Sequence, residues 1–157
     1  GMQFPLIVKN NRGRFGQDNH LVKSTAELKK LLAPHQDNPY IVQEFIPNDG
    51  DLRVLMIGDS YRIIRRRAQS GSHLNNTSAG GVAELISSEE LPSPIVDQCR
   101  TIMRACRLQI AGIDVIRHKQ TGEYYFLEVN VLPQLDTGAF KEEKAALLAS
   151  FMHDQLG

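Results

Sequence analysis

Short apolar runs separated by polar turns run through the chain. Residues 6–8, 21–22, 40–46, 52–57 and 61–67 are apolar or alternate apolar with polar positions. Alternation with a period of two is typical of a strand with one buried face. Two more runs, residues 113–116 and 124–130, flank a turn-forming segment at 119–122. They predict a hairpin in the second half of the chain.

Three other segments space their apolar residues as helices do. Ser24 and Glu27 form a capping box that predicts a helix to about Ala33. Ser93 and Pro94 indicate the start of a second helix. Thr137, or a residue near it, is expected to cap a third. The predicted buried positions are Val96, Cys99, Ile102, Met103 and Cys106 in the second helix, and Ala145, Leu148, Phe151 and Met152 in the third.

Two polar segments divide the chain. Residues 47–50, Pro-Asn-Asp-Gly, favour a hinge between two lobes. We therefore expect a first lobe at residues 1–47 and a second at residues 48–157. Residues 69–81 contain glycines without periodicity and predict a long loop.

Composition indicates a soluble globular protein. Lysines plus arginines number 18 and aspartates plus glutamates number 18, which gives no sign of nucleic-acid or membrane binding. No apolar run approaches 18 residues, and no signal peptide is visible. Cys99 and Cys106 are too far apart along one helix for a disulfide, so we expect buried thiols in a reducing compartment. Together these features predict a cytoplasmic protein.

Asp114, Glu128 and Asn130 are the most informative residues, because apolar strands have no ordinary reason to carry two acids and an amide on one face. Glu128 and Asn130 share a face since strand side chains alternate. An antiparallel hairpin brings Asp114 close to both. Carboxylate and amide oxygens suit Mg²⁺, which usually bridges phosphates. The trio predicts a metal–nucleotide site.

Lys9 ends the first strand and precedes a polar loop that contains Gly13 and Gly16. Backbone amides of such a loop cradle phosphates, and the lysine adds a positive charge. An ordinary hairpin with a surface lysine also explains these residues, and taken alone that interpretation is favoured. Because the loop joins two strands, it is neither a Walker A loop nor a Rossmann turn.

The next candidates are also ambiguous by themselves. The strand end at Glu44, Phe45 and Ile46 offers backbone donors and acceptors of the kind that an adenine edge needs. A plain strand end without a ligand explains the same residues equally well. Asp51 accepts hydrogen bonds from ribose hydroxyls, or it is a turn residue.

Three consecutive arginines occupy one strand. Alternation places Arg65 and Arg67 on one face and Arg66 on the other. Such a cluster suits a phosphate or carboxylate, or it protects an edge strand by charge. Asn76 and Gly81 lie in the long loop. Two interpretations are open for this loop: a lid or substrate contact, and a plain connection between strands.

The order of these motifs resembles the ATP-grasp superfamily. Within it, the chain looks most like the RimK-type glutamate ligases, which are relatives of glutathione synthetase. The resemblance covers nearly the whole chain, and its strongest parts are the Gln-Glu-Phe-Ile hinge at 43–46, the Asp51-x-Arg53 strand and the Asp114…Glu128-x-Asn130 set. It implies an α+β fold of two lobes with antiparallel sheets and the nucleotide between them.

The resemblance implies ATP and Mg²⁺ as cofactors and gives the nucleotide its contacts. Lys9 would meet the α- and β-phosphates, and the loop from Gly13 to Gly16 would cover the outer phosphates. Glu44, Phe45 and Ile46 would meet adenine mainly by backbone, and Asp51 would hold ribose.

The same resemblance implies the catalytic set. Asp114, Glu128 and Asn130 would bind one or two magnesium ions. Arg67 first, with Arg53 and Arg66 behind it, would face the transferred phosphate, and Asn76 would lie along the substrate.

The implied reaction makes an amide through an acylphosphate, by charge neutralisation and positioning. The partner would be an amino acid or a peptide or protein carboxylate, and the oligomeric state is open. Eight residues precede Lys9, so we expect an incomplete catalytic fragment. Gln134 stands where the family usually has glycine. A nucleotide-binding module that no longer ligates, and a purely structural domain, are the alternatives.

Overall fold

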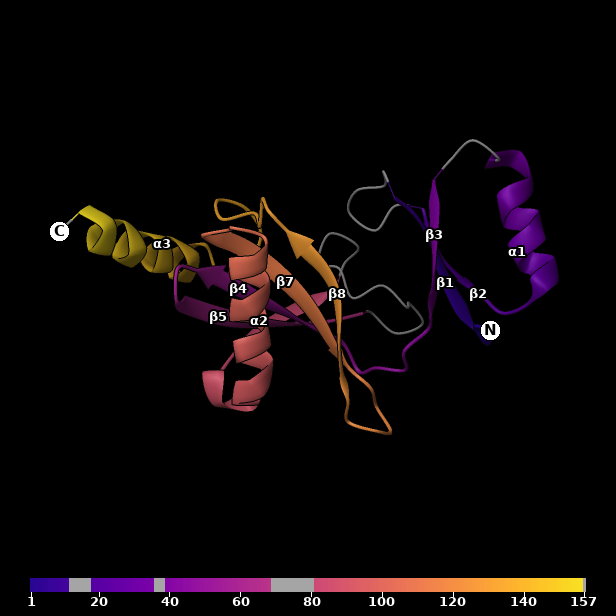
Figure 1. Ribbon diagram of the computed structural model, residues 1–157, viewed down its shortest axis with the longest axis horizontal. Coiled ribbons are helices and arrows are strands. Elements are labelled where there is room, and N and C mark those ends of the chain that lie inside the picture. Colours follow the sequence, from indigo (N-terminus) through magenta and orange to yellow (C-terminus); the bar gives the residue numbers. More distant parts are fainter. Residues whose placement is uncertain (12–17, 36–38, 69–80, 157) are drawn as a thin grey trace.

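The described residues form two antiparallel sheets. The computed structural model describes residues 1–11, 18–35, 39–68 and 81–156. In the described part, the smaller sheet has the strand order β2-β1-β3 and the larger has the order β6-β5-β4-β7-β8 (Figure 1). With the helices that accompany them, these sheets confirm the α+β class that was predicted.

The smaller sheet holds β1 (Leu6–Asn10), β2 (Asn19–Val22) and β3 (Tyr40–Glu44). Helix α1 (Thr25–Leu32) lies at its side in Figure 1, and the short helix η1 (Ala33–His35) follows. The side chain of Ser24 accepts a hydrogen bond from the Glu27 amide, which confirms the predicted N-cap. Leu6, Val8 and Val22 are the buried residues of this sheet. Lys9 therefore lies on the face opposite to Leu6 and Val8.

The larger sheet holds β4 (Asp51–Ile57), β5 (Ser60–Arg67), β6 (Val82–Ile86), β7 (Ile110–Arg117) and β8 (Tyr124–Asn130). The short helix η3 (Ser88–Glu90) and helix α2 (Ser93–Ala105) follow β6, and α3 (Lys141–Leu156) ends the chain. One face packs its apolar side chains against α2. The buried residues of that core are Val54, Met56, Ile63, Ile86, Leu91, Val96, Cys99, Met103, Ala111, Ile113 and Val115.

The second face of the larger sheet is covered only in part. Leu55 and Ile57 are buried there against Leu147 of α3. Because side chains alternate along β4, Asp51 and Arg53 share this face with Leu55 and Ile57. The part of the face that carries Asp51 and Arg53 is therefore available for a functional site.

The segment between the sheets is tied to the β7–β8 turn. The Lys119 amide donates to the Pro47 carbonyl at 2.7 Å, and Lys119 Nζ lies 2.6 Å from Asp49 Oδ1. Asn48 donates to the Ile46 carbonyl and accepts from the Gly50 amide. The predicted lobe division after residue 47 falls in this segment and stays a prediction.

The sequence analysis missed one strand and misplaced the start of the last helix. Strand β6 was not foreseen, because its five residues directly follow the long glycine-containing loop. Helix α2 begins at Ser93 as predicted, and Pro92 is its N-cap residue, since the Pro92 carbonyl accepts from the Ile95 and Val96 amides. Helix α3 begins at Lys141 and is not capped by Thr137, because Phe140 just before it has a positive φ of 59°.

Two predicted helix faces also need correction. Cys106 is exposed, because it is the C-cap residue just after α2 and Arg107 turns the chain with φ 54°. In α3 the buried residues are Lys144 and Leu147, whereas Ala145 and Met152 are exposed. The face of α3 toward the sheet is thus shifted by about one residue from the predicted stripe.

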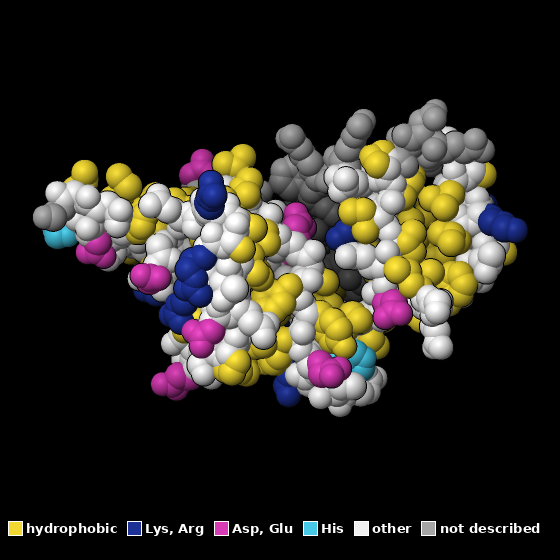
Figure 2. Space-filling view, viewed as in Figure 1, with side chains coloured by type: hydrophobic (Ala, Val, Ile, Leu, Met, Phe, Trp, Pro, Cys, Tyr) yellow, Lys and Arg dark blue, Asp and Glu magenta, His cyan; other side chains and the backbone are white. Residues whose placement is uncertain are grey.

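The surface carries charges of both signs. In Figure 2 the Lys, Arg, Asp and Glu side chains are interspersed on the face shown rather than gathered by sign. Among the described residues, no helix has the length and apolarity that crossing a membrane requires.

Candidate active site

The β7–β8 hairpin brings the predicted metal trio together. Asp114 pairs with Glu128 in the antiparallel register, and Gly112 pairs with Asn130. A register irregularity follows at Asp114 and Val115. Asp114 is 7% exposed, whereas Glu128 is exposed at the surface of the edge strand. The hairpin predicted from sequence is confirmed, with all three oxygen-bearing side chains at one end.

Asn130 links the trio to an arginine. With its amide oriented to satisfy its neighbours, Asn130 Nδ2 donates to Glu128 Oε1 at 3.0 Å. Its Oδ1 accepts from Arg53 Nη2 at 3.1 Å. The amide therefore lies between a carboxylate and a guanidinium.

Two arginines from neighbouring strands converge on Asp114. Arg53 of β4 donates from Nε and Nη2 to its two carboxylate oxygens, at 2.8 and 2.9 Å. Arg66 of β5 places Nη2 2.9 Å from Asp114 Oδ2 and donates from Nε to Asp51 Oδ1 at 2.6 Å. The bidentate Arg53–Asp114 pair fixes the planes of both groups, and Arg66 bridges Asp114 and Asp51. The result is a compact Asp51–Arg66–Asp114–Arg53 cluster.

Burial sets the electrostatics of this cluster. Burial raises the pKa of Asp51, and the guanidinium of Arg66 opposes that rise. Burial by itself would lower the pKa of Arg66, but Asp114 and Asp51 raise it above its ordinary value. Arg66 therefore stays a permanent cation beside Asp114.

Of the arginines named in the sequence analysis, the structure brings Arg53 and Arg66 together and places Arg67 apart from them. Arg67, the first choice for the transferred phosphate, lies on the opposite face of β5 from Arg66. Its side chain is 54% exposed and 3.4 Å from Glu84. Arg65 shares that face and contacts Glu84 and Glu90. The structure thus groups Arg66, and not Arg67, with Arg53.

Asp51 has a partner that the sequence did not predict. Its carboxylate is 6% exposed and is held by Arg66 in the larger sheet. The predicted ribose contact stays a prediction. In this structure the Asp51 carboxylate accepts a hydrogen bond from Arg66.

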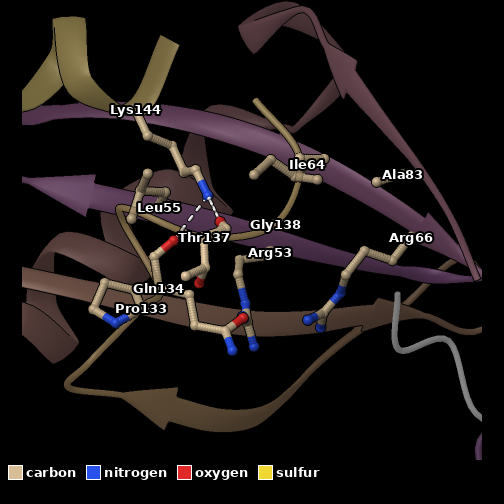
Figure 3. Close-up of a pocket in the computed structure, with 11 residues that line it drawn as sticks. Arg53, Leu55, Ile64, Arg66, Ala83, Pro133, Gln134, Thr137, Gly138 and Lys144 are labelled. Carbon is tan, nitrogen blue, oxygen red and sulfur yellow. Dashed lines mark hydrogen bonds between the residues drawn. The ribbon is translucent and has the colours of Figure 1, made fainter. Parts of the chain in front are cut away.

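A pocket adjoins the cluster. Figure 3 shows Arg53 near the middle of the view with the Gln134 side chain beside it, Arg66 farther to the right, and Leu55, Ile64 and Ala83 above them. The loop after β8 contributes Pro133, Gln134, Thr137, Gly138 and Ala139. Arg53 therefore lies between the Asp114 carboxylate and the pocket.

Lys144 is a site residue that the sequence analysis missed. It is 5% exposed, and its Nζ donates to the carbonyls of Gln134 and Thr137 at 2.8 and 2.5 Å (Figure 3). Burial lowers its pKa. The only sequence signal was its spacing of three, four and seven residues from Leu147, Leu148 and Phe151.

The smaller sheet carries the predicted nucleotide residues. Lys9 lies in the middle strand, half-buried. The Phe45 amide donates to the Pro5 carbonyl, and Leu6 pairs with Glu44 in the register. In an antiparallel ladder this leaves the backbone groups of Glu44 pointing away from β1. The adenine prediction thus has backbone groups to use, although no contact tests it.

Three predicted residues, Gly13, Gly16 and Asn76, lie outside the described residues. Their predicted roles therefore stay predictions.

Comparison with known proteins decides the family. A model of the RimK-like ATP-grasp domain matches residues 1–150. The chain belongs to the RimK-like ATP-grasp family. A coenzyme gamma-F420-2:alpha-L-glutamate ligase of Methanococcus maripaludis is 30% identical over 137 residues, which are 84% of this chain and 46% of that protein. The chain spans 46% and 33% of the length of the first two curated relatives that it matches.

Solved structures share the fold. D-alanine--D-alanine ligase from Bacillus anthracis superposes with a TM-score of 0.70 at 22% identity, over 98% of this chain and 55% of that chain. The macrocyclase MdnC bound with precursor peptide MdnA, from Microcystis aeruginosa, gives a TM-score of 0.67 at 17% identity, over 96% and 48%. These similarities confirm that the RimK-like chain has the ATP-grasp fold.

The donor set of this RimK-like domain fits a hard divalent cation. Among the described residues, no group of three or more His, Cys, Asp and Glu side chains could hold a metal ion. A site at the hairpin therefore needs the opposite orientation of the Asn130 amide, with Oδ1 instead of Nδ2 facing Glu128. Two carboxylates and an amide oxygen are the ligands that Mg²⁺ accepts when it keeps several waters and binds phosphates.

Proposed function

We propose that this chain carries the nucleotide and metal site of an ATP-dependent carboxylate–amine ligase that forms an amide through an acylphosphate. One observation carries the proposal. Asp114, Glu128 and Asn130 lie together at one end of a hairpin, with Arg53 and Arg66 against Asp114. Oxygen donors for a cation beside two permanent cations suit a transferred phosphate.

The proposed reaction has two balanced steps. A substrate carboxylate oxygen attacks the γ-phosphorus of ATP, the bond to the β-phosphate oxygen breaks, and ADP leaves. An amine then attacks the acyl carbon, phosphate leaves with the bonding pair, and the nitrogen loses a proton. Magnesium, when bound, neutralises phosphate charge.

The chain's own residues would bind and orient the reactants. Asp114, Glu128 and Asn130 would hold the metal. Arg53 would stabilise the transferred phosphoryl group from the pocket side, while Arg66 fixes Asp114. In the smaller sheet, Lys9 would meet the phosphates and the backbone at Glu44 would meet adenine.

The substrate class is an amino acid or a peptide or protein carboxylate. A relative named as a glutamate ligase and a structural neighbour bound with a precursor peptide support this class. We also propose that residues 1–47 and 48–157 act as two lobes around the nucleotide, and that the protein works in the cytoplasm, where ATP is available.

The test is calorimetric titration of Mg-ADP and Mg-ATP into the 157-residue chain. Glu128→Gln removes one proposed ligand at an exposed position, and Glu123→Gln in the same hairpin is the matched control. We expect binding that needs magnesium, at least about tenfold weaker in Glu128→Gln and unchanged in Glu123→Gln. This tenfold loss corresponds to about 1.4 kcal/mol.

Two outcomes contradict the proposal. If the wild type and Glu128→Gln bound the magnesium nucleotides with equal affinity, the hairpin would not hold the metal site. Failure of the wild type to bind either nucleotide would show that this chain does not carry the nucleotide site. Phosphate release with candidate amino acids then distinguishes a ligase from a module that only binds nucleotide.

A further inference from the structure

Strand β7 contains a buried glycine next to the site. Gly112 pairs with Leu55 of β4 on one side and with Asn130 of β8 on the other. Glycine weakens the interior of a strand, because it loses more backbone freedom on folding than other residues and has no side chain to pack. A glycine at this position therefore needs a physical reason.

The backbone conformation does not supply that reason. Gly50, Gly58, Gly122 and Gly138 have positive φ angles, which glycine adopts freely, and Gly112 is not among them. An alanine could follow the same strand path at this position. The reason for glycine must therefore be the space that a side chain would fill.

That space is occupied by Arg53 and Pro133. A Cβ added at Gly112 would lie 3.3 Å from Cδ and 3.4 Å from Nε of Arg53, and 3.2 Å from Cβ of Pro133. Carbon atoms in favourable contact are about 3.5–4.0 Å apart. Nε of Arg53 is also the atom that donates to Asp114 Oδ1 at 2.8 Å. An added side chain would therefore press on the donor itself.

Arg53 crosses β7 at this glycine. It lies on β4 directly opposite Asp114, and its Nη2 is 3.1 Å from the side-chain amide of Asn130 on β8. Because Asn130 pairs with Gly112, the path from β4 to Asn130 runs over Gly112. Figure 3 shows the Arg53 side chain extending from β4 over the neighbouring strand. One arginine thus links three strands through the space that the missing side chain leaves.

A side chain at residue 112 should disturb Arg53 selectively. Pressure at Cδ and Nε would lift the guanidinium away from β7, and its bond from Nε to Asp114 would weaken steeply with length and angle. Arg66 reaches the same carboxylate from β5, and none of its atoms is among the three nearest to the added Cβ. The Arg66 contacts should therefore survive.

We propose that Gly112 is the positioning residue of Arg53, because its lack of a side chain lets the arginine lie across β7 and contact both Asp114 and Asn130. This inference rests on the proposed function insofar as Arg53 is taken to face the transferred phosphoryl group. It assigns to a residue without chemical groups of its own a part in setting the geometry of the site.

The first test measures the two arginines separately. Exchange of each Nε–H proton with water is followed by ¹⁵N NMR in the 157-residue chain, and the resonances are assigned by their loss in Arg53→Lys and Arg66→Lys. In Gly112→Ala the Arg53 proton should exchange at least about tenfold faster. The Arg66 proton, which Asp51 accepts, is the internal control and should keep its rate.

The second test asks which neighbour requires the glycine. Gly112→Ala should lower the melting temperature of the wild type and raise that of Arg53→Ala, because alanine is favoured over glycine in a strand once the space is empty. If Pro133 alone required the space, Gly112→Ala would lower both melting temperatures equally. That result would overturn the inference. If Arg53→Ala does not fold, the exchange rates decide without it.

The third test connects the position of Arg53 to the nucleotide. Gly112→Ala should weaken binding of Mg-ATP about threefold more than binding of Mg-ADP, since ADP lacks the phosphoryl group that Arg53 is proposed to meet. Glu123→Gln, in the same hairpin, is the control and should keep the wild-type ratio of the two affinities. An unchanged ratio in Gly112→Ala would overturn the link to the phosphoryl group.

The outcomes separate this inference from the proposed function. Selective acceleration of exchange at Arg53, with Arg66 unaffected, supports the positioning role. Unchanged exchange at Arg53, or equal acceleration at both arginines, overturns it, because the second pattern is that of a general loss of stability. Failure of the wild type to bind either nucleotide overturns the proposed function, while the exchange rates still decide whether Gly112 positions Arg53.

Discussion

Arg53 and Asp114 meet as a bidentate pair although 61 positions separate them in sequence. Nε and Nη2 of the arginine lie 2.8 and 2.9 Å from the two carboxylate oxygens. The β4–β7 register sets Arg53 directly opposite Asp114. The carboxylate proposed to bind metal is thus also a structural partner of buried cations, so its replacement affects both folding and binding.

Substituting Asp114 should therefore destabilise the fold as well as the metal site. Asp114→Asn leaves Arg53 and Arg66 without their shared counter-charge, which costs about 3 kcal/mol of unfolding free energy by analogy with broken buried pairs. Glu128→Gln, at an exposed position, should change it by less than about 0.5 kcal/mol. Urea unfolding of both variants checks this. Equal stabilities would show that the arginines do not depend on Asp114.

Arg66 and Arg67 are adjacent in sequence and should differ in importance. The Arg66 side chain is 7% exposed and contacts Asp51 and Asp114, so Arg66→Met should cost about 3 kcal/mol. The Arg67 side chain is 54% exposed, so Arg67→Met should cost less than about 0.5 kcal/mol. Denaturant melts of the two variants provide the comparison. A larger cost at Arg67 would contradict the assignment of faces on β5.

Asp18 should make the stability of the smaller sheet depend on pH in the acid range. Its carboxylate accepts from His20, Asn10 and Tyr40, and these hydrogen bonds, with His20 first, lower its pKa. A lowered pKa in the folded state means that the stabilisation is present above the unfolded pKa of about 3.9 and is lost as pH falls through the folded value.

The matched variant is Asp18→Asn, because asparagine also tolerates the positive φ of 58° at this position. Unfolding midpoints are measured between about pH 5 and about pH 2. The wild type should lose more stability over this interval than Asp18→Asn does. Parallel pH profiles would rule out a contribution from Asp18.

The two thiols should react at very different rates. Cys99 is fully buried, and burial raises its pKa to about 11. Cys106 is exposed at the end of α2. A disulfide reagent at about pH 8 should modify one thiol in the native protein and the second only after unfolding, since the thiolate is the reactive form. Rapid modification of both thiols would contradict the packing of α2 against the sheet.

Local sequence was sufficient for most elements. Short apolar or alternating runs predicted β4, β5, β7 and β8, and the Ser24 cap predicted α1, because these signals depend on neighbours within one strand or one turn. The elements that went wrong depend on context. The start of α3 is set by Phe140 and Gly138 with positive φ, and β6 exists because β5 offers it an edge.

The candidate site divides in the same way. Asp114, Glu128 and Asn130 were identifiable because a single hairpin fixes their relation through the alternation of its strands. The sequence by itself determined this trio, the strand-rich pattern and the resemblance to the ATP-grasp superfamily.

Only the tertiary structure decided which charged residues join the trio. Arg66 rather than Arg67 reaches Asp114, Asp51 serves Arg66, and Lys144 holds the loop at Gln134. Each of these contacts crosses between strands or elements, and its existence depends on register, on which face packs against α2 and on where α3 begins. Sequence spacing does not encode those relations, because they arise from burying apolar side chains that lie far apart along the chain.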